Sequence, residues 1–433
     1  MANNEIETQK RRTFRNTFFN LSVFEFLTFL RRGVFYTFMI YYLYKLMGTV
    51  TSTAALGTMT MVASSLGQNL LWGRICDKYK IRTKLIVMGE TIAAFTYLMV
   101  FLVHKSLING GNNFAAGLAI IFGLSILEFF WSMSDVGWAA LLTDITTPET
   151  RGRVVGSMNF IASLGRMVGI LYSGFLYLGG EGFENGTIFY IVIVMLLIGA
   201  ALMAFTSRRI GAKRAIPQQA ATTETETEEN EPDIQSEKPY HWFLASLVII
   251  VFGAASINQI FLLFLQLPQG LNFTDTQVTF VTSAWTVGGM IASLGAGRLS
   301  DRFGRSKVLL LGLSLATVTP AFYLYASTVP LMAFIYGLNG ISFWTIQTVG
   351  FVLAGDLIPK HRRGRLLSRY NTVIALSWGP AGILIGGPLA DLQVQRLGLS
   401  SYASYVNAFY AASIIVAVGT ALFAMKVARL KHD

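Results

Sequence analysis

The chain consists of long apolar runs separated by short polar breaks, and this alternation limits its possible folds more than any other feature. Twelve runs can be read, with ends within a few residues of 17–46, 53–73, 84–104, 114–143, 153–178, 187–207, 242–267, 276–297, 307–327, 330–355, 366–389 and 402–426. A helix needs about 20 mostly apolar residues to cross a bilayer. Only 13% of the 433 residues are charged, about half the share in an ordinary soluble protein. The sequence therefore predicts an all-α membrane protein with twelve transmembrane helices.

The basic residues of the chain gather in the breaks between these runs. The net charge of +11 would also suit a nucleic-acid-binding protein, but most of the 34 lysines and arginines lie in the tails and in every second loop, on one side of the membrane. Loops of this kind are cytoplasmic in membrane proteins. We therefore expect a multi-pass protein of the plasma membrane, embedded in the lipid bilayer, with both termini in the cytoplasm and no nucleic-acid partner.

One charged segment occurs twice, at corresponding points of two halves. Asp144 is followed by basic residues and then by Asn159, and Asp356 and Asn371 repeat this arrangement at the same spacing. A duplicated six-helix unit explains the repeat. Residues 208–241, between the halves, are polar and charged and cannot bury apolar surface. The predicted parts are a cytoplasmic N-terminal tail (1–16), an N-terminal six-helix bundle (17–207), a cytoplasmic linker (208–241), a C-terminal six-helix bundle (242–426) and a cytoplasmic C-terminal tail (427–433).

A second charged segment also occurs twice, each time between the second and third runs of a half. The residues that define it are Gly73, Asp77, Lys78 and Arg82 in the first copy, and Gly297, Asp301, Arg302, Gly304 and Arg305 in the second. The pattern G-x-x-x-D-R/K-x-G-R-R/K resembles the loop between helices 2 and 3 of the major facilitator superfamily, and its repeat between helices 8 and 9. Lys80 stands where the first copy should have its second glycine. The resemblance implies two pseudo-symmetric six-helix bundles that transport a solute by alternating access.

These segments allow a structural and a functional interpretation. Asp77 and Asp301 precede the next apolar run, where a carboxylate can cap the start of a helix and complement its dipole. The basic residues by themselves are topology anchors. The resemblance implies instead a cytoplasmic gate, whose ion pairs form in one transport state and part in the other. It implies the same for Asp144 with Arg151 or Arg153, and for Asp356 with Arg363 or Arg365.

Charged residues within the predicted spans lie almost wholly in the first half. They are Glu25, Arg31, Arg32, Glu90, Glu128, Asp135 and Arg166. A charge at the bilayer centre costs at least about 2.5–3.5 kcal/mol, so such residues face a cavity or pair with one another. A rise of about 1.5 Å per residue places Glu25 and Asp135 in one layer. The residues of a second, deeper layer are Arg31 or Arg32, Arg166 and Glu128.

The acids of these layers are candidates for proton coupling. A carboxylate in a partly dry cavity can take up and release a proton, and the candidates are Glu25, Glu128 and Asp135. A static network of ion pairs that only fixes the packing of the helices is the competing interpretation. Glu90 lies close enough to the end of its span to reach the membrane interface, and we interpret it as structural.

Candidates for contact with a solute come from both halves. Arg31, Arg32 and Arg166 provide positive charge, and Arg32 is suited to hold an anionic solute. The second half contributes neutral amides, of which Gln259 and Gln347 are the best candidates for cavity contacts. Amides also hold transmembrane helices together, which is the structural alternative.

The sequence as a whole predicts a secondary active transporter, a monomer that moves a small organic solute by alternating access and couples it to protons. An uncoupled uniporter and a receptor or sensor on a transporter scaffold are the alternatives. No catalytic set, nucleotide-binding loop or metal cluster stands out, and the single cysteine, Cys76, excludes an internal disulfide. We expect no enzymatic activity, no cofactor and no metal.

Overall fold

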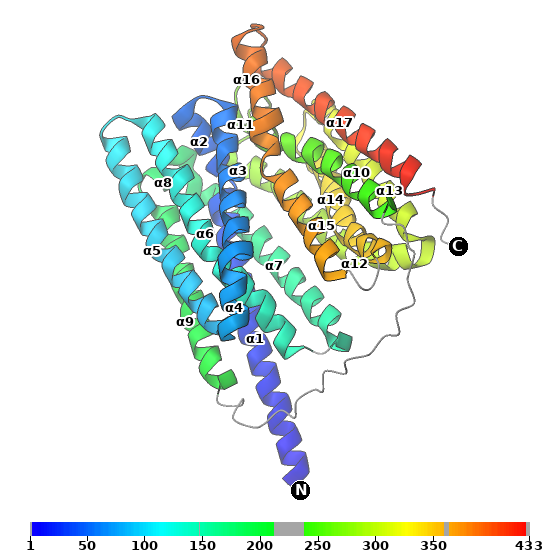
Figure 1. Cartoon of the computed structure of the whole chain (residues 1–433). Coiled ribbons are helices and arrows are strands. Elements are labelled where there is room, and N and C mark those ends of the chain that lie inside the picture. The colour runs from blue at the N-terminus through cyan, green and yellow to red at the C-terminus, as the bar shows by residue number, and fades with distance from the viewer. Residues whose placement is uncertain (1, 147, 212–237, 359–362, 430–433) are drawn as a thin grey trace.

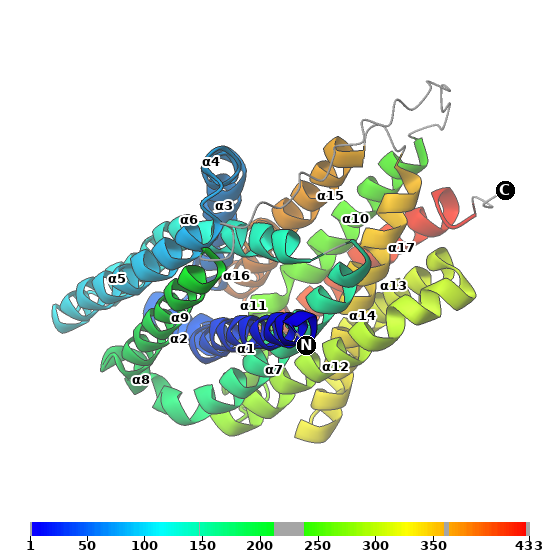
Figure 2. The ribbon, with the colours of Figure 1, turned by 90° about the horizontal axis from the view of Figure 1, so that it is seen from below.

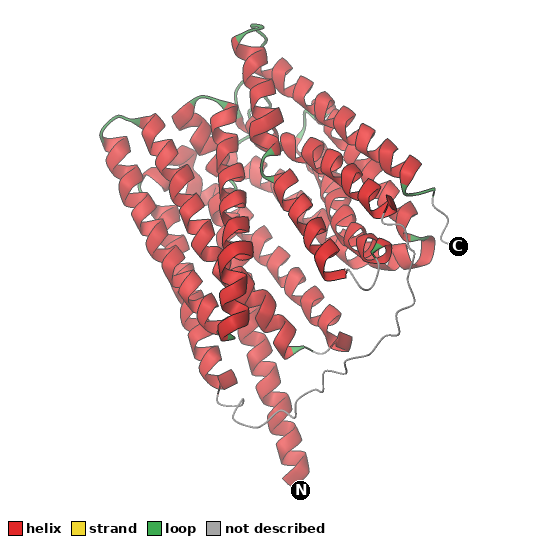
Figure 3. Cartoon of the chain, viewed as in Figure 1, coloured by secondary structure: helices red, strands yellow, loops and turns green. Residues whose placement is uncertain are grey.

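A computed structural model describes the chain except for residues 1, 147, 212–237, 359–362 and 430–433. Helices are the only regular secondary structure in this described part, as Figure 3 shows. Nine of the described helices are long and apolar enough to cross a membrane. The predicted all-α membrane fold is therefore confirmed, and the chain is an integral membrane protein.

The first half of the chain folds into a bundle of long helices. They are α1 (Ala2–Tyr36), α2 (Met39–Met47), α3 (Val50–Leu66), α4 (Gly73–Tyr79), α5 (Arg82–Asn109), α6 (Asn113–Ile145), α7 (Pro148–Tyr177), α8 (Glu181–Glu184) and α9 (Thr187–Gly211). Helix α5 packs along α6 and α9, α1 packs along α7 and α9, and α3 packs along α6 (Figure 2). Helices α1, α6 and α7 thereby enclose a space that charged side chains of this half line.

The second half repeats this arrangement. Its helices are α10 (Lys238–Ser256), α11 (Asn258–Gln266), α12 (Asp275–Phe303), α13 (Arg305–Phe322), α14 (Val329–Leu357), α15 (Arg363–Trp378), α16 (Gly387–Gln395) and α17 (Ser401–Lys426). Helix α13 packs along α14 and α17, α10 packs along α15 and α17, and α12 packs along α14. Each of these pairs corresponds to a pair in the first half, in the same chain order, as a duplicated unit requires.

Four of the predicted spans are interrupted helices rather than single ones, and one of them is the span 242–267, which consists of α10 and α11. The predicted span 17–46 consists of α1 and α2, and the span 53–73 consists of α3, a π-helical turn at Gly67–Trp72, and the start of α4. The span 366–389 consists of α15, a second π-helical turn at Gly382–Gly386, and the start of α16. Glycine and π-helical turns loosen the regular hydrogen-bond ladder and let a helix bend.

Several helices continue beyond the apolar runs of the sequence. Helix α1 already begins at Ala2, and α9 continues to Gly211. Helix α10 begins at Lys238, so α9 and α10 both extend into the predicted linker, 208–241. Hydropathy marks where a helix enters the bilayer, whereas its backbone hydrogen bonds continue into polar residues.

Among the described residues, α7 packs along α12 between the two halves, and the remaining contacts between the halves gather toward one end. We call the end with the α4–α5 and α12–α13 connections the basic end, and the end with the α2–α3 and α16–α17 connections the far end. At the far end α3 packs against α16 and α2 against α11, and one buried apolar cluster runs through both halves. Toward the basic end each half has a cluster of its own, and Figure 1 shows α4 and α15 diverging there. Apolar burial therefore joins the halves at the far end in this conformation.

The repeated segment at the basic end is placed differently from the prediction. Asp77 lies in the last turn of α4 and Asp301 in the last turn of α12, so both end a helix. The residues that precede α5 and α13 are Ile81 and Gly304, and neither forms a side-chain cap. The predicted capping of these helices by the two aspartates is therefore wrong, because the chain turns only after them.

A residue with a positive φ follows the helix in both copies. Gly304 has a φ of 94° and Lys80 has a φ of 52°. Glycine adopts positive φ freely, whereas another L-residue pays about 1–2 kcal/mol for it. The substitution of lysine for the pattern's glycine therefore keeps the turn in the first copy at a local energetic cost.

Candidate functional site

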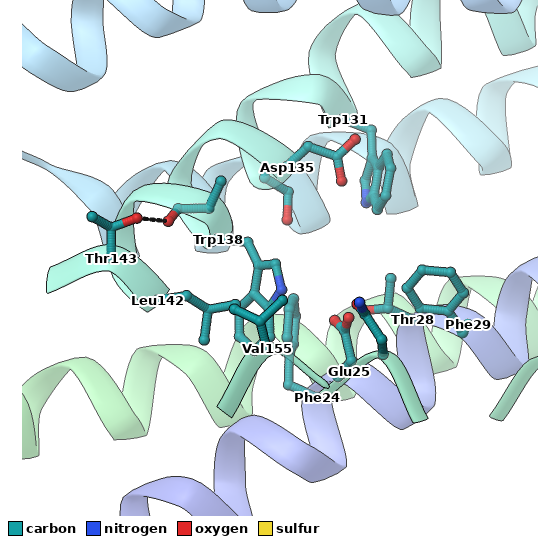
Figure 4. A pocket seen from close by; sticks show the side chains of 13 residues that line it. Phe24, Glu25, Thr28, Phe29, Trp131, Asp135, Trp138, Leu142, Thr143 and Val155 are labelled. Atoms are coloured by element: carbon teal, nitrogen blue, oxygen red, sulfur yellow. Dashed lines mark hydrogen bonds between the residues drawn. The ribbon is translucent and has the colours of Figure 1, made fainter. Parts of the chain in front are cut away.

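A cavity of about 330 Å³ opens between α1, α6 and α7 in the first half (Figure 4). Two acidic side chains line it, Glu25 from α1 and Asp135 from α6, and Figure 4 shows them on facing helices. The rest of the lining is largely apolar and includes Phe24, Phe29, Trp131, Trp138, Leu142 and Val155. The two acids that helical rise places at one depth thus share one cavity.

Neither carboxylate of this cavity has a partner among the described residues. Glu25 and Asp135 form no hydrogen bond or ion pair there, although Glu25 is only 6% exposed. The electrostatic neighbours of Glu25 include Asp135, Arg32 and Glu90. Those of Asp135 include Arg32 and Glu128. An unpaired carboxylate inside a membrane span is costly, and uptake of a proton removes that cost. The pair is therefore placed to exchange a proton with the cavity.

Trp131 of α6 lies against the two adjacent arginines of α1. The guanidinium of Arg32 is 4.3 Å from the centre of the indole ring, and that of Arg31 is 5.0 Å from it. Arg31 is only 1% exposed and donates a 3.2 Å hydrogen bond to the hydroxyl of Tyr97. The Arg32 side chain is 33% exposed. Arg31 is therefore part of the bundle interior, whereas Arg32 reaches open space.

Glu90 of α5 lies in the interior of the first half. It is 1% exposed, and one carboxylate oxygen accepts hydrogen bonds from Trp131 Nε1 at 2.8 Å and from Ser134 Oγ at 2.7 Å. Arg31 is among its electrostatic neighbours. The predicted reach of Glu90 to the membrane interface is therefore wrong, because the side chain faces α6 and not the end of its own helix.

Only part of the predicted deeper layer comes together. Glu128 accepts a 2.9 Å hydrogen bond from the hydroxyl of Tyr36, and its other oxygen lies 4.0 Å from Arg32. Arg166 of α7 does not join this pair. Its guanidinium lies 5.3 Å from the ring centre of Trp285, a residue of α12 in the other half. Arg166 therefore faces the space between the halves.

A second cavity, of about 450 Å³, lies between α3 and the α14–α15 pair. Its lining residues are Met61, Phe343, Gln347, Phe351, Tyr370, Asn371, Ile374 and Trp378. The predicted cavity residue Gln347 is thus in a cavity. Gln259 lines neither of these two cavities; its amide packs against Gly57 of α3 and Gly382 of the second half, where the halves are in contact.

The ion pairs of the two repeated charged segments join helices within one half. Arg82, the first residue of α5, lies 2.7 Å from Asp144 of α6. Arg305, the first residue of α13, pairs in the equivalent way with Asp356 of α14. The partners predicted for Asp144 and Asp356 are different residues, whose side chains lie outside the described part of the chain; they are Arg151, Arg153, Arg363 and Arg365. In both halves an ion pair thus connects the first repeated segment, which contains Arg82 or Arg305, to the second, which contains Asp144 or Asp356.

The pair of Arg82 and Asp144 is expected to stabilise the first half by about 1 kcal/mol, because its side chains are only 20% and 23% exposed. A double-mutant cycle with Arg82→Gln and Asp144→Asn, measured by thermal unfolding of the purified protein, should give a coupling free energy of this size. Lys84→Gln, which removes an exposed charge nearby, should add to Asp144→Asn without coupling. Additive effects of Arg82→Gln and Asp144→Asn would contradict the expectation.

Asp391 of α16 joins the two halves at the far end. Its carboxylate accepts hydrogen bonds from the backbone N–H groups of Val50 and Thr51, at 3.0 and 2.9 Å, and from the Thr51 hydroxyl at 2.6 Å. These groups form the first turn of α3, where a negative charge satisfies free N–H groups and complements the helix dipole. Nearby, the Thr58 hydroxyl donates to the carbonyl oxygen of Gly379 at 2.8 Å. The contact between Asp391 and α3 is not predictable from the sequence, which shows only that an acidic residue lies at the end of a predicted span.

Comparison with known proteins points to one family. The sequence model of the Major Facilitator Superfamily matches residues 21–272 and 244–433. An uncharacterized MFS-type transporter of Mycobacterium tuberculosis is 28% identical over 158 residues, which are 36% of this chain and 22% of that protein. The multidrug resistance protein MdtL of Escherichia coli O157:H7 is 25% identical over 135 residues, which are 31% of this chain and 34% of that protein. The chain thus spans about a fifth to a third of the length of these curated relatives.

Solved structures share the fold of the whole chain. A bacterial homologue of the human lysosomal transporter Spinster, in an inward-facing and unoccupied conformation, gives a TM-score of 0.71 at 11% identity, over 96% of this chain and 97% of that chain. A bacterial homologue of the iron transporter ferroportin, in an inward-facing state, gives 0.68 at 14% identity, over 95% of this chain and 98% of that chain. At these identities the likeness concerns the fold alone.

Proposed function

The chain belongs to the major facilitator superfamily, and we propose that it is a secondary active transporter, which moves a small organic solute across the plasma membrane and couples that movement to protons. The observation that carries the proposal is the pair of unpartnered carboxylates, Glu25 and Asp135, in one cavity of the membrane-spanning part. The names of the relatives, an MFS-type transporter and a multidrug resistance protein, support the transport activity.

The bodies that move in this proposal are the two six-helix bundles, residues 17–207 and 242–426. They are in contact at the far end and diverge at the basic end, which we propose to be cytoplasmic because of its basic loops. In the opposite state the far-end contacts part and the basic end closes. The solute therefore meets one side of the membrane at a time, which is alternating access.

Arg32 links the proton to the solute in this mechanism. It is an electrostatic neighbour of both Glu25 and Asp135, and it is also the weakly held partner of Glu128, at 4.0 Å. A proton on either cavity acid weakens the attraction between that acid and Arg32, and loss of the proton restores it. The position and availability of the guanidinium thus depend on the protonation of the cavity.

Transport by the purified protein in proteoliposomes separates this function from its alternatives. The solute is chosen by a thermal-shift screen against sugars, peptides, organic acids and lipophilic cations. Under an imposed pH gradient we expect the solute to accumulate above its external concentration, and a protonophore to abolish the accumulation. Mere equilibration, as by a uniporter, would contradict proton coupling. Binding without movement, as by a receptor, would contradict transport.

A further inference from the structure

Arg166 is a cation for which the described part of the chain provides no acidic partner. Its side chain is exposed, although it lies within the apolar part of α7 that is long enough to span the membrane. Among the described residues it forms no ion pair, and its electrostatic neighbours are Tyr336 and a second cation, Arg32. A charge at this depth is costly unless a counter-charge accompanies it. The positive charges of Arg166 and Arg32 are therefore only partly neutralised by acidic side chains among the described residues.

Arg32 offers a second donor group close to Arg166. Its contact with Glu128 is long, at 4.0 Å, and its Nε atom is buried without a hydrogen-bond partner. The face of its guanidinium lies on the indole ring of Trp131, 4.3 Å from the ring centre. A guanidinium that stacks through its face keeps its N–H edges for oxygen acceptors, and carboxylate, sulfonate and phosphate groups fit this edge.

A continuous aromatic wall leads from Arg166 to the second cavity. The ring of Trp285 is 5.3 Å from the Arg166 guanidinium, the ring of Phe343 is 5.2 Å from that of Trp285, and the ring of Trp378 is 5.0 Å from that of Phe343. The indole N–H of Trp285 donates a 3.2 Å hydrogen bond to Asn339, which fixes the ring. Phe343 and Trp378 line the cavity of about 450 Å³, whose lining contains amides and no charged side chain.

We propose that Arg166 and Arg32 hold the acidic group of an aromatic organic anion, and that its ring lies along Trp285 and Phe343 into the second cavity. A cavity of about 450 Å³ has the size of sites that hold small organic molecules. The arginines come from the first half and the aromatic wall from the second, so the bound anion contacts both bodies that move. This assignment rests on the proposed function, because it names the class of solute.

Binding of naphthalene-1-sulfonate to the protein in lipid nanodiscs, with empty nanodiscs as the blank, tests the assignment. Two comparison compounds divide the ligand into its parts: naphthalene-1-sulfonamide has the ring without the charge, and methanesulfonate has the charge without the ring. We expect both to bind at least about tenfold more weakly than the sulfonate. Equal binding of the sulfonamide would overturn the assignment, and so would failure of naphthalene-1-sulfonate, 1-naphthoate and 1-naphthyl phosphate all to bind.

Variants identify the residue that holds the acidic group. Arg166→Gln should weaken binding of the sulfonate at least about tenfold and leave binding of the sulfonamide unchanged, whereas Arg166→Lys should retain part of the affinity. Arg298→Gln is the matched control. It removes an exposed arginine near the C-terminal end of α12, the helix that contains Trp285, and should bind the sulfonate as the wild type does. Unchanged sulfonate affinity in a folded Arg166→Gln protein would overturn the assignment.

Failure of this inference can be told apart from failure of the proposed function. Uphill accumulation of a sugar or a lipophilic cation, without binding of any naphthalene anion, would overturn the anion site and leave proton-coupled transport standing. Binding of naphthalene-1-sulfonate that depends on Arg166, without any movement of it into proteoliposomes, would support the site and contradict transport of this anion.

Discussion

The Asp391→Ala variant is expected to shift the protein toward a conformation whose far end is open. In the wild type the carboxylate accepts hydrogen bonds from Val50 and Thr51, and these bonds join the second half to the first. Hydrogen bonds to a charged group contribute about 1.5–3 kcal/mol. A loss of about 2 kcal/mol changes the ratio of closed to open far ends about 30-fold.

Double electron–electron resonance measures this shift in a cysteine-free background. Spin labels at Asn109 and Ser400 report on the far end, and labels at Lys84 and Lys307 report on the basic end; all four residues are exposed. In Asp391→Ala we expect the longer far-end distance and the shorter basic-end distance to gain population. The opposite changes at the two ends follow from the proposed alternating access, in which one end closes as the other opens.

Graded variants connect the shift to the hydrogen bonds themselves. Thr51→Val removes only the bond from the hydroxyl, and Asp391→Asn keeps an acceptor oxygen without the charge. Both should therefore shift the distances less than Asp391→Ala does. Distance distributions that stay at wild-type values in Asp391→Ala would rule out this contact as a determinant of far-end closure.

The Arg31→Met variant is expected to lose the most stability of any single change in the charged interior. Arg31 is 1% exposed, hydrogen-bonded to Tyr97 and an electrostatic neighbour of Glu90, which is also 1% exposed. Removal of one member of a buried set of opposite charges typically costs about 3–5 kcal/mol, because the other is left without its counter-charge. The bonds from Trp131 and Ser134 to Glu90 compensate only part of this.

Unfolding of the purified protein by denaturant in detergent micelles measures the loss. A second change, Glu90→Gln, keeps an acceptor for Trp131 and Ser134 and removes the orphaned charge, so Arg31→Met with Glu90→Gln should recover much of the stability. Arg32→Met is the matched control and should cost less, because the Arg32 side chain is 33% exposed. Equal losses for Arg31→Met and Arg32→Met would contradict the distinction between the two arginines.

The sequence predicts depth along a helix well and direction around it poorly. Glu25 and Asp135 share a cavity because the rise per residue fixes how deep each one lies. Arg31 and Arg32 are adjacent, yet they point about 100° apart around the helix, and only the packing of α1 decides which neighbour each one meets. Arg166 was expected in the same layer as Glu128, but α7 turns it toward the other half.

The fold was predictable because short stretches of sequence indicate it. The ion pairs at the basic end and the contacts at the far end were not predictable, because they join residues that lie far apart in the chain. Apolar runs and repeated charged segments identify the spans and the duplication. A polar break does not show where within it the helix ends, which is why Asp77 and Asp301 were expected to begin a helix and instead end one. The contact of Asp391 with Thr51 joins residues far apart in the chain, so no local pattern reveals it.

Proton coupling at the cavity acids is tested most directly by comparing net accumulation with exchange in Glu25→Gln/Asp135→Asn proteoliposomes. An amide cannot release a proton, so the double variant should lose accumulation driven by a pH gradient and still exchange internal for external solute across a pH series. The Glu128 carboxylate already accepts a hydrogen bond from Tyr36, so Glu128→Gln should lose less of the accumulation. Wild-type accumulation in the Glu25→Gln/Asp135→Asn variant would contradict proton coupling through this cavity.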